Sequence, residues 1–118
     1  MAHSTQVLQR FLQPRYVQMQ EPLAVGGAGS RLAGAQVEIH LGVVHGILQA
    51  RFRAYGCPAT IASADWLAEQ LDGLAIDAPR PDRHSIMRAL DLGPARQHCA
   101  ALAVEAMDAA FTALKTNT

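Results

Sequence analysis

The order of apolar and polar residues changes period along the chain, which predicts helices at both ends and strands in the middle. The first predicted helix begins after Ser4, a residue type that favours helix N-caps, and ends before Pro14, which cannot continue the hydrogen-bond ladder. Its apolar residues share one face: Val7, Leu8, Phe11 and Leu12. The following residues 16–34 show no clear period and are rich in glycine, so we expect a long loop with one short strand near residues 23–25.

Two strands follow, in which every second residue is apolar. Such alternation indicates that one face of each strand is buried and the other is in contact with water. The residues of the predicted buried face are Val37, Ile39, Leu41, Leu48, Ala50, Phe52 and Ala54. Residues 43–46 join the two strands as a tight turn, so we predict an antiparallel hairpin.

Helical spacing returns after the hairpin. We predict three helices: one that starts near Pro58 or Thr60 and runs up to residues 72–73, a short one around residues 86–90, and a last one from residue 97 or 98 to 114. Asp65 and Glu69, four residues apart in the first of these, are predicted to lie on a solvated face. The order of helix, loop, hairpin and three helices is typical of an α+β fold, a small antiparallel β-sheet packed against helices.

Composition narrows the class of protein. The 118 residues predict a single domain over residues 1–118, and a half-apolar, 17% charged composition excludes a disordered chain. Ten Lys and Arg balance ten Asp and Glu, so the net charge is zero and a nucleic-acid partner is disfavoured, because such proteins carry a basic excess. The charged fraction is below the usual ~25%, which favours a surface covered by a partner or a homo-oligomer.

Targeting signals are also predicted to be absent. No window approaches 18 consecutive apolar residues, so no membrane-spanning helix is expected. The first six residues lack the cationic and apolar regions of a signal peptide. We therefore expect a cytoplasmic protein whose two cysteines stay as thiols.

The candidate chemistry lies at the two cysteines, which both fall at junctions between elements. Cys57 lies between a strand and a helix, and Cys99 lies in the first turn of the last helix, after Arg96 and His98. Because a helix N-terminus and a nearby cation lower the pKa of a thiol, Cys99 is predicted to be the more reactive thiol. The alternative is that both cysteines are buried apolar fillers and that His98 is a cap or a surface residue.

Three segments of the chain resemble one family. Residues 51–63, RFRAYGCPATIAS, resemble the RFxxYGCxxxIAS segment of the NifU/IscU-type iron–sulfur cluster scaffold proteins. Residues 92–99, LGPARQHC, resemble the family segment LPPVKxHC, and residues 13–17, QPRYV, resemble NPRNV. The order and spacing hold across the chain to about residue 114, and two cysteine motifs in register are more specific than either alone.

The resemblance implies an IscU-like α+β fold with its cysteines together at one end. Cys57, Cys99 and His98 would then bind metal, as iron or a labile [2Fe–2S] cluster. Cys99 would carry the chemistry as the principal sulfur acceptor. The resemblance implies no enzyme activity of its own, and no acid, base and nucleophile set stands out elsewhere in the sequence.

The resemblance also implies three kinds of partner. A cysteine desulfurase would donate the sulfur, and apo iron–sulfur proteins would receive the cluster. An Hsp70-type chaperone would bind the segment formed by Leu92, Gly93, Pro94, Ala95 and Arg96.

The chain departs from the family in a loop that reads PxCGD in its members. The aligned residues 31–35 are RLAGA, so Ala33 stands in place of a cysteine and Ala35 in place of an aspartate. A [2Fe–2S] cluster or a structural zinc ion takes four protein ligands, and this chain offers three at most. We therefore predict weak, labile metal binding by the isolated protein.

Two alternatives follow from the same residues. A degenerate scaffold would act as a non-catalytic adaptor or regulator that binds a cysteine desulfurase or a chaperone, and the loss of two residues in one loop favours this. A zinc-binding sulfur-transfer protein would hold zinc in place of iron at the same residues. The sequence leaves both open.

Overall fold

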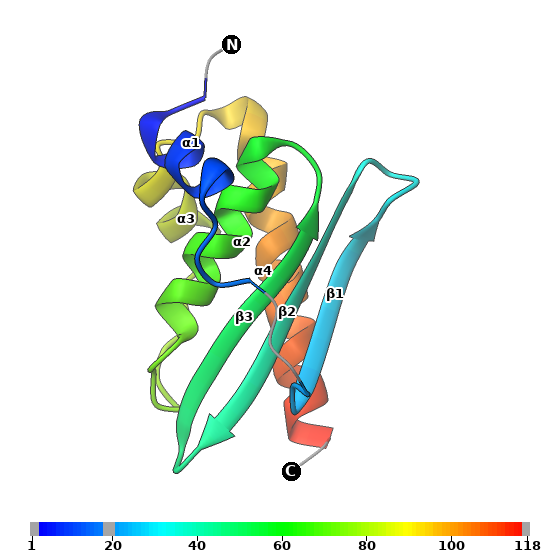
Figure 1. Cartoon of the computed structure of the whole chain (residues 1–118), viewed down its shortest axis with the longest axis vertical. Coiled ribbons are helices and arrows are strands. Elements are labelled where there is room, and N and C mark those ends of the chain that lie inside the picture. The colour runs from blue at the N-terminus through cyan, green and yellow to red at the C-terminus, as the bar shows by residue number, and fades with distance from the viewer. Residues whose placement is uncertain (1–2, 18–20, 117–118) are drawn as a thin grey trace.

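The computed structural model describes residues 3–17 and 21–116, which fold as a three-stranded sheet with helices on one side (Figure 1). In chain order the elements are α1 (Thr5–Leu12), β1 (Ala24–Ser30), β2 (Ala35–Val44), β3 (Ile47–Tyr55), α2 (Pro58–Leu71), α3 (Arg83–Leu90), the 3₁₀ turn η1 (Pro94–Arg96) and α4 (Gln97–Thr116). The predicted α+β class is confirmed.

The sheet is antiparallel in the order β1-β2-β3, and its apolar face packs against α2 and α4. The register pairs Ile39 with Phe52 and Leu41 with Ala50, so the alternating residues of β2 and β3 share one face. The predicted hairpin is confirmed, with a two-residue turn at His45 and Gly46, both at positive φ. The core consists of this face together with the apolar stripes of α2 and α4.

We predicted a long loop over residues 16–34 with one short strand near residues 23–25; a strand does begin there, but the loop prediction is wrong for residues 24–30, which form a complete strand that pairs with β2 along its length. Gly26 of this strand reflects the close approach of α4. A Cβ on Gly26 would lie 1.9 Å from the backbone nitrogen of Ala110 and 2.5 Å from the carbonyl oxygen of Ala106. Tertiary packing therefore requires glycine where local propensity disfavours a strand.

The prediction of a solvated face at Asp65 is also wrong, because this side chain is fully buried. Oδ1 of Asp65 accepts the backbone N–H groups of Arg15 and Tyr16, at 2.8 and 2.9 Å, and Oδ2 lies 3.0 Å from Nη1 of Arg10. Glu69 is partly exposed and also pairs with Arg10. The carboxylate of Asp65 therefore holds α1 and the segment that follows it against α2 through hydrogen bonds and an ion pair.

α1 begins and ends where the sequence predicts, with the hydroxyl of Ser4 accepting the backbone N–H of Val7. Of its apolar face only Val7 is buried, whereas Leu8, Phe11 and Leu12 are exposed.

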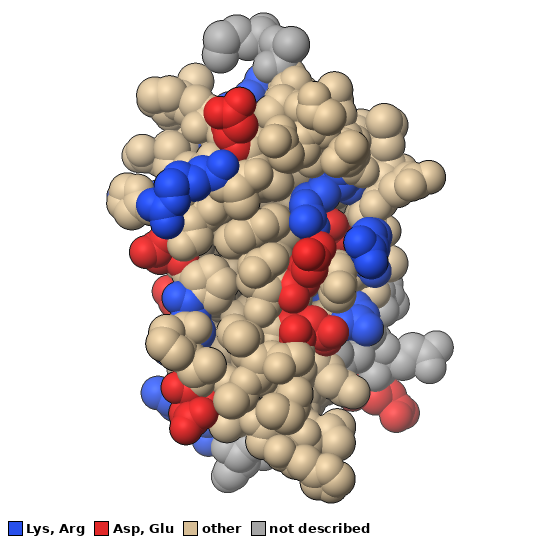
Figure 2. All heavy atoms as spheres, turned by 90° about the vertical axis from the view of Figure 1, so that its left-hand side faces the viewer, with Lys and Arg blue, Asp and Glu red and all other residues tan. Residues whose placement is uncertain are grey.

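The surface on the α1 and α3 side of the molecule carries both signs of charge, interspersed among uncharged residues (Figure 2). Within the described residues, no helix combines the length and apolarity needed to cross a membrane.

Candidate functional site

Cys57 is the N-cap residue of α2, directly after the sharp turn that leads out of β3. The turn depends on Gly56, whose φ is +149° and whose hypothetical Cβ would lie 3.1 Å from the side chain of Thr60. Pro58 then starts the helix with its fixed φ. The side chain of Cys57 is partly exposed.

Cys99 lies in the first turn of α4, which the 3₁₀ turn η1 leads into. Its side chain is fully buried, whereas the neighbouring His98 is exposed. The Sγ atoms of Cys57 and Cys99 lie 3.8 Å apart, although 42 residues separate the two cysteines in the chain. The structure thus brings the two predicted thiols into contact.

Three further side chains contact this pair of sulfurs. The hydroxyl of Thr60, one helical turn after Cys57 and 1% exposed, lies 3.6 Å from both Sγ atoms. Nε2 of His98 lies 3.5 Å from Sγ of Cys99, and Nη1 of Arg96 lies 3.9 Å from Sγ of Cys57. The sulfur pair therefore has a hydroxyl, an imidazole and a guanidinium within reach.

The two thiols differ in acidity. Burial opposes the ionisation of Cys57, but hydrogen bonds from Thr60, Cys99 and the Ala59 backbone outweigh it and hold the pKa of Cys57 below the usual 9.0. Burial raises the pKa of Cys99 above 9.0, and Cys57 adds to this while Thr60 and Arg96 act in the opposite direction. The predicted lowering of the Cys99 pKa by its helix position is therefore wrong, because burial dominates.

The β1–β2 turn, which carries the departures from the family motif, lies at the same end of the sheet as Cys57. Gln36 pairs with Tyr55, two residues before Cys57, and the guanidinium of Arg31 lies 4.8 Å from the centre of the Tyr55 ring. Ala33 is exposed and Gly34 has φ +89°. Position 33 is thus on the side of the molecule where the thiols lie.

The residues at this end provide two thiols and one imidazole as donors. A separation of 3.8 Å matches two thiolates on one tetrahedral metal ion with bonds of about 2.3 Å. Within residues 3–17 and 21–116, however, no group of three or more His, Cys, Asp or Glu side chains is arranged to hold a metal ion. The sulfur pair fits two coordination positions, and His98 does not complete a three-residue site in this arrangement.

The segment proposed as a chaperone site, residues 92–96, connects α3 to α4 and includes η1. Pro94 and Ala95 are exposed, and Leu92 packs against the core.

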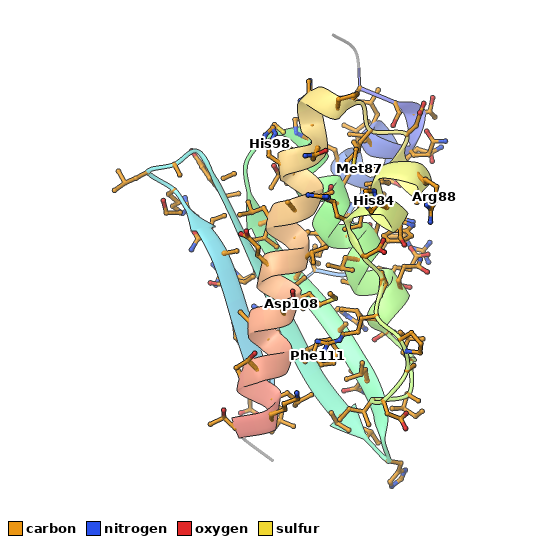
Figure 3. The ribbon with its side chains drawn as sticks, turned by 180° about the vertical axis from the view of Figure 1, so that it is seen from behind. His84, Met87, Arg88, His98, Asp108 and Phe111 are labelled. Atoms are coloured by element: carbon orange, nitrogen blue, oxygen red, sulfur yellow. The ribbon has the colours of Figure 1, made fainter. Side chains whose placement is uncertain are left out.

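Figure 3 shows His98 at the start of α4, pointing away from α3, whereas His84, Met87 and Arg88 lie on α3. His84 is therefore separate from the sulfur pair.

Thr60 is the site residue that the sequence analysis did not single out. It follows Cys57 by three positions, which places it across the first turn of α2 from the N-cap. That spacing was a usable signal for the contact with Cys57. The contact with Cys99 depends on how α4 packs against α2, which no local pattern shows.

Comparison with known proteins assigns the fold to a class, the small α+β domains of iron–sulfur cluster assembly. The family model described as the NifU-like N terminal domain matches residues 2–118, and the chain belongs to that family. The iron–sulfur cluster assembly scaffold protein IscU of Escherichia coli (strain K12) is 31% identical over 98% of this chain and 96% of its own length. The bifunctional protein NifU/MnmA of Rubrobacter xylanophilus is 36% identical over 92% of this chain, which spans 24% of the length of that protein.

Solved structures show the same fold. The iron–sulfur cluster assembly scaffold protein for the SUF system from Fervidobacterium islandicum superposes with a TM-score of 0.71 at 15% identity, covering 92% of this chain and 96% of its own. The N-terminal part of a nitrogen-fixing NifU-like protein from Brucella abortus gives a TM-score of 0.65 at 20% identity, covering 96% of this chain and 92% of its own. At these identities the likeness supports the fold alone.

Proposed function

We propose that this protein is an iron–sulfur cluster assembly scaffold that accepts sulfur, binds iron or a labile [2Fe–2S] cluster, and passes it to apo-proteins. The family and the relatives named as scaffold proteins support the scaffold function. The observation that carries the proposal is the 3.8 Å contact between the sulfurs of Cys57 and Cys99. Sulfur and iron are cargo in this function, and the protein is not a catalyst with its own turnover.

The residue roles follow from the donor chemistry. Cys99 retains the sulfane sulfur, and Cys57 and Cys99 bind iron through their thiolates, with His98 as a further ligand after its ring moves to the metal. Alanine at positions 33 and 35 offers no donor, so a fourth ligand comes from water or from a partner. Iron held by so few protein ligands exchanges readily, which suits a protein that gives its cargo away.

The proposed function requires a partner that donates sulfur and a partner that receives the cluster. A cysteine desulfurase supplies the sulfur, and apo iron–sulfur proteins receive the product. The exposed residues of the 92–96 segment, Pro94 and Ala95, are the candidate contact for an Hsp70-type chaperone. Arg96 of that segment contacts Cys57, so chaperone binding there would act directly on the sulfur pair.

The adaptor and zinc alternatives are not favoured by the comparisons, because IscU relatives about 30% identical to this chain are named for cluster assembly itself. The sulfur pair is also intact, whereas an adaptor that had lost cluster building would have no need to keep its two thiols in contact. The zinc alternative asks for four ligands in a closed site, more than this chain provides.

Anaerobic reconstitution with ferrous iron, L-cysteine, a cysteine desulfurase and dithiothreitol, a thiol that reduces sulfane sulfur to sulfide, tests the proposal. We expect bound iron and acid-labile sulfide in the wild type and loss of both in Cys99→Ala. In a parallel reaction without iron and dithiothreitol, we expect sulfane sulfur to be retained on Cys99. His98→Ala should lower iron retention, and His84→Ala on α3 is its matched control. Equal iron and sulfide in Cys99→Ala and the wild type would refute the assignment.

A further inference from the structure

The two thiols differ in their access to solvent. Cys99 is 0% exposed, while Cys57 is partly exposed at the junction of β3 and α2. Sulfur transfer between proteins requires the accepting thiolate to reach the outer sulfur of the donor persulfide, so access limits which cysteine can react first. A desulfurase persulfide can reach Cys57 without a rearrangement of the fold, and it cannot reach Cys99 in this way.

We propose that Cys57 is the entry point for sulfur and hands it on to Cys99, so that the pair works as a two-step relay. This inference rests on the proposed function, because it takes for granted that a persulfide donor supplies the sulfur. It assigns Cys57 a reaction of its own in addition to binding iron.

Each step of the relay is a thiol exchange that balances without an oxidant or a reductant. In the first, the Cys57 thiolate attacks the outer sulfur of the desulfurase persulfide, forming Cys57–S–S⁻ and releasing the desulfurase cysteine as a thiolate. In the second, the Cys99 thiolate attacks the outer sulfur of the Cys57 persulfide, which forms Cys99–S–S⁻ and returns Cys57 to a thiolate. One sulfur–sulfur bond forms and one breaks in each step, and the proton of each attacking thiol passes to solvent or to the departing thiolate.

The geometry supports the second step. The two Sγ atoms are already in contact at 3.8 Å, and the sulfur–sulfur bond of a persulfide is about 2 Å long, so rotation about the Cβ–Sγ bond of Cys57 brings its outer sulfur to Cys99. The hydroxyl of Thr60 contacts both sulfurs and so lies beside both the donor and the acceptor. The chain has two cysteines, so no third thiol of its own competes for the sulfur.

A time-resolved persulfidation experiment tests the relay. The full chain is mixed with a cysteine desulfurase and L-cysteine without iron, quenched by alkylation at intervals, and mapped by mass spectrometry. In the wild type we expect sulfur on Cys57 first and on Cys99 later. In Cys99→Ala, sulfur should accumulate on Cys57, and in Cys57→Ser the rate of labelling at Cys99 should fall by about tenfold or more.

Cys57→Ser is the appropriate variant because Cys57 is the N-cap of α2, where serine is favoured, so the helix is preserved. Alkylation of the native wild type by iodoacetamide, without any desulfurase, should modify Cys57 before Cys99. The relay is refuted if Cys57→Ser labels Cys99 at the wild-type rate, or if Cys99 is alkylated first. Absence of sulfur from both cysteines of the wild type would instead refute the proposed function, so the two failures are distinguishable.

Discussion

The hydroxyl of Thr60 lies 3.6 Å from Sγ of Cys99, in a position where it also contacts Sγ of Cys57 at the same distance. Because Thr60 is 1% exposed, water does not compete strongly for these contacts. A hydroxyl that donates to a thiolate favours the charged form of the thiol. Thr60 thereby helps to hold the pKa of Cys57 below 9.0, although burial acts against it.

The first prediction concerns this hydroxyl. Thr60→Val removes the donor and keeps the shape of the side chain, so the pKa of Cys57 should rise toward its usual value. The measurement is the rate of iodoacetamide modification of Cys57 as a function of pH. The inflection of this pH–rate profile should lie below pH 9.0 in the wild type and at a higher pH in Thr60→Val. Thr60→Ser keeps the hydroxyl and should resemble the wild type. An unchanged profile in Thr60→Val would show that this hydroxyl does not stabilise the thiolate.

The second prediction concerns the pH dependence of stability in Cys57→Ser, where Cys99 is the one remaining thiol. Burial, the leading cause, keeps the pKa of Cys99 above the 9.0 of an unfolded chain. The neutral thiol therefore stabilises the fold fully below pH 9.0, and this contribution declines as the pH rises through the raised pKa. Urea unfolding should show a steeper alkaline loss than in the double variant Cys57→Ser/Cys99→Ala, which corrects for the other groups. Parallel pH curves would contradict a raised Cys99 pKa.

The third prediction concerns the buried carboxylate of Asp65. Asp65→Ala leaves two backbone N–H groups and the guanidinium of Arg10 without this partner, so the free energy of unfolding should fall by about 3 kcal/mol. Glu69→Ala is the control, because it removes a partly exposed pair with the same arginine and should cost less than about 1 kcal/mol. Urea denaturation of both variants measures the difference, and equal losses would mean that the buried hydrogen bonds contribute little.

The fourth prediction concerns the glycines of β1. Gly26→Ala places a Cβ within 1.9 Å of the backbone nitrogen of Ala110, so β1 and α4 must separate, at a cost of about 3 kcal/mol. The next residue provides the control, because a Cβ on Gly27 would meet its nearest atom at 3.8 Å on the other face. Gly27→Ala should change the stability by less than about 1 kcal/mol. Thermal or urea unfolding compares the two, and similar stabilities would show that the strand adjusts to α4 without cost.

The fifth prediction concerns the β1–β2 turn and depends on the proposed function. Ala33→Cys adds a thiol to an exposed turn at the same end of the sheet as Cys57, so the reconstituted protein should retain more iron per chain and lose it more slowly to a chelator. Ala33→Ser has nearly the same size without the thiol and should behave as the wild type. If Ala33→Cys retains no more iron than Ala33→Ser, the turn does not reach the sulfur pair.

Local patterns accounted for most elements of the fold. Ser4 and Pro14 mark the two ends of α1, the alternation in residues 37–54 corresponds to the β2–β3 hairpin, and Pro58 starts α2. These predictions succeeded because each depends on the backbone of a few neighbouring residues. Only the start of β1 was predicted, as a short strand near residues 23–25, because the glycine at position 26 is explained by contact with α4, some eighty residues further along the chain.

The candidate site likewise has some features that the sequence predicted and others that depend on tertiary packing. The two cysteine motifs, and with them Cys57, Cys99 and His98, could be identified from the residues and their family resemblance. The contact of Thr60 with both sulfurs and the direction of the Cys99 pKa could not, because both depend on burial between α2 and α4. The helix position of Cys99 favours ionisation, but its full burial outweighs that effect.

The sequence by itself determined which residues can react, the class of the fold and the loss of two family residues at positions 33 and 35. These depend on residue types and on spacing along the chain. Only the tertiary structure decided that the sulfurs of Cys57 and Cys99 are in contact, that Cys57 is partly exposed while Cys99 is buried, and that Asp65 of α2 binds Arg10 of α1. Such properties arise when segments distant in the chain exclude water from one another, and no segment has them alone.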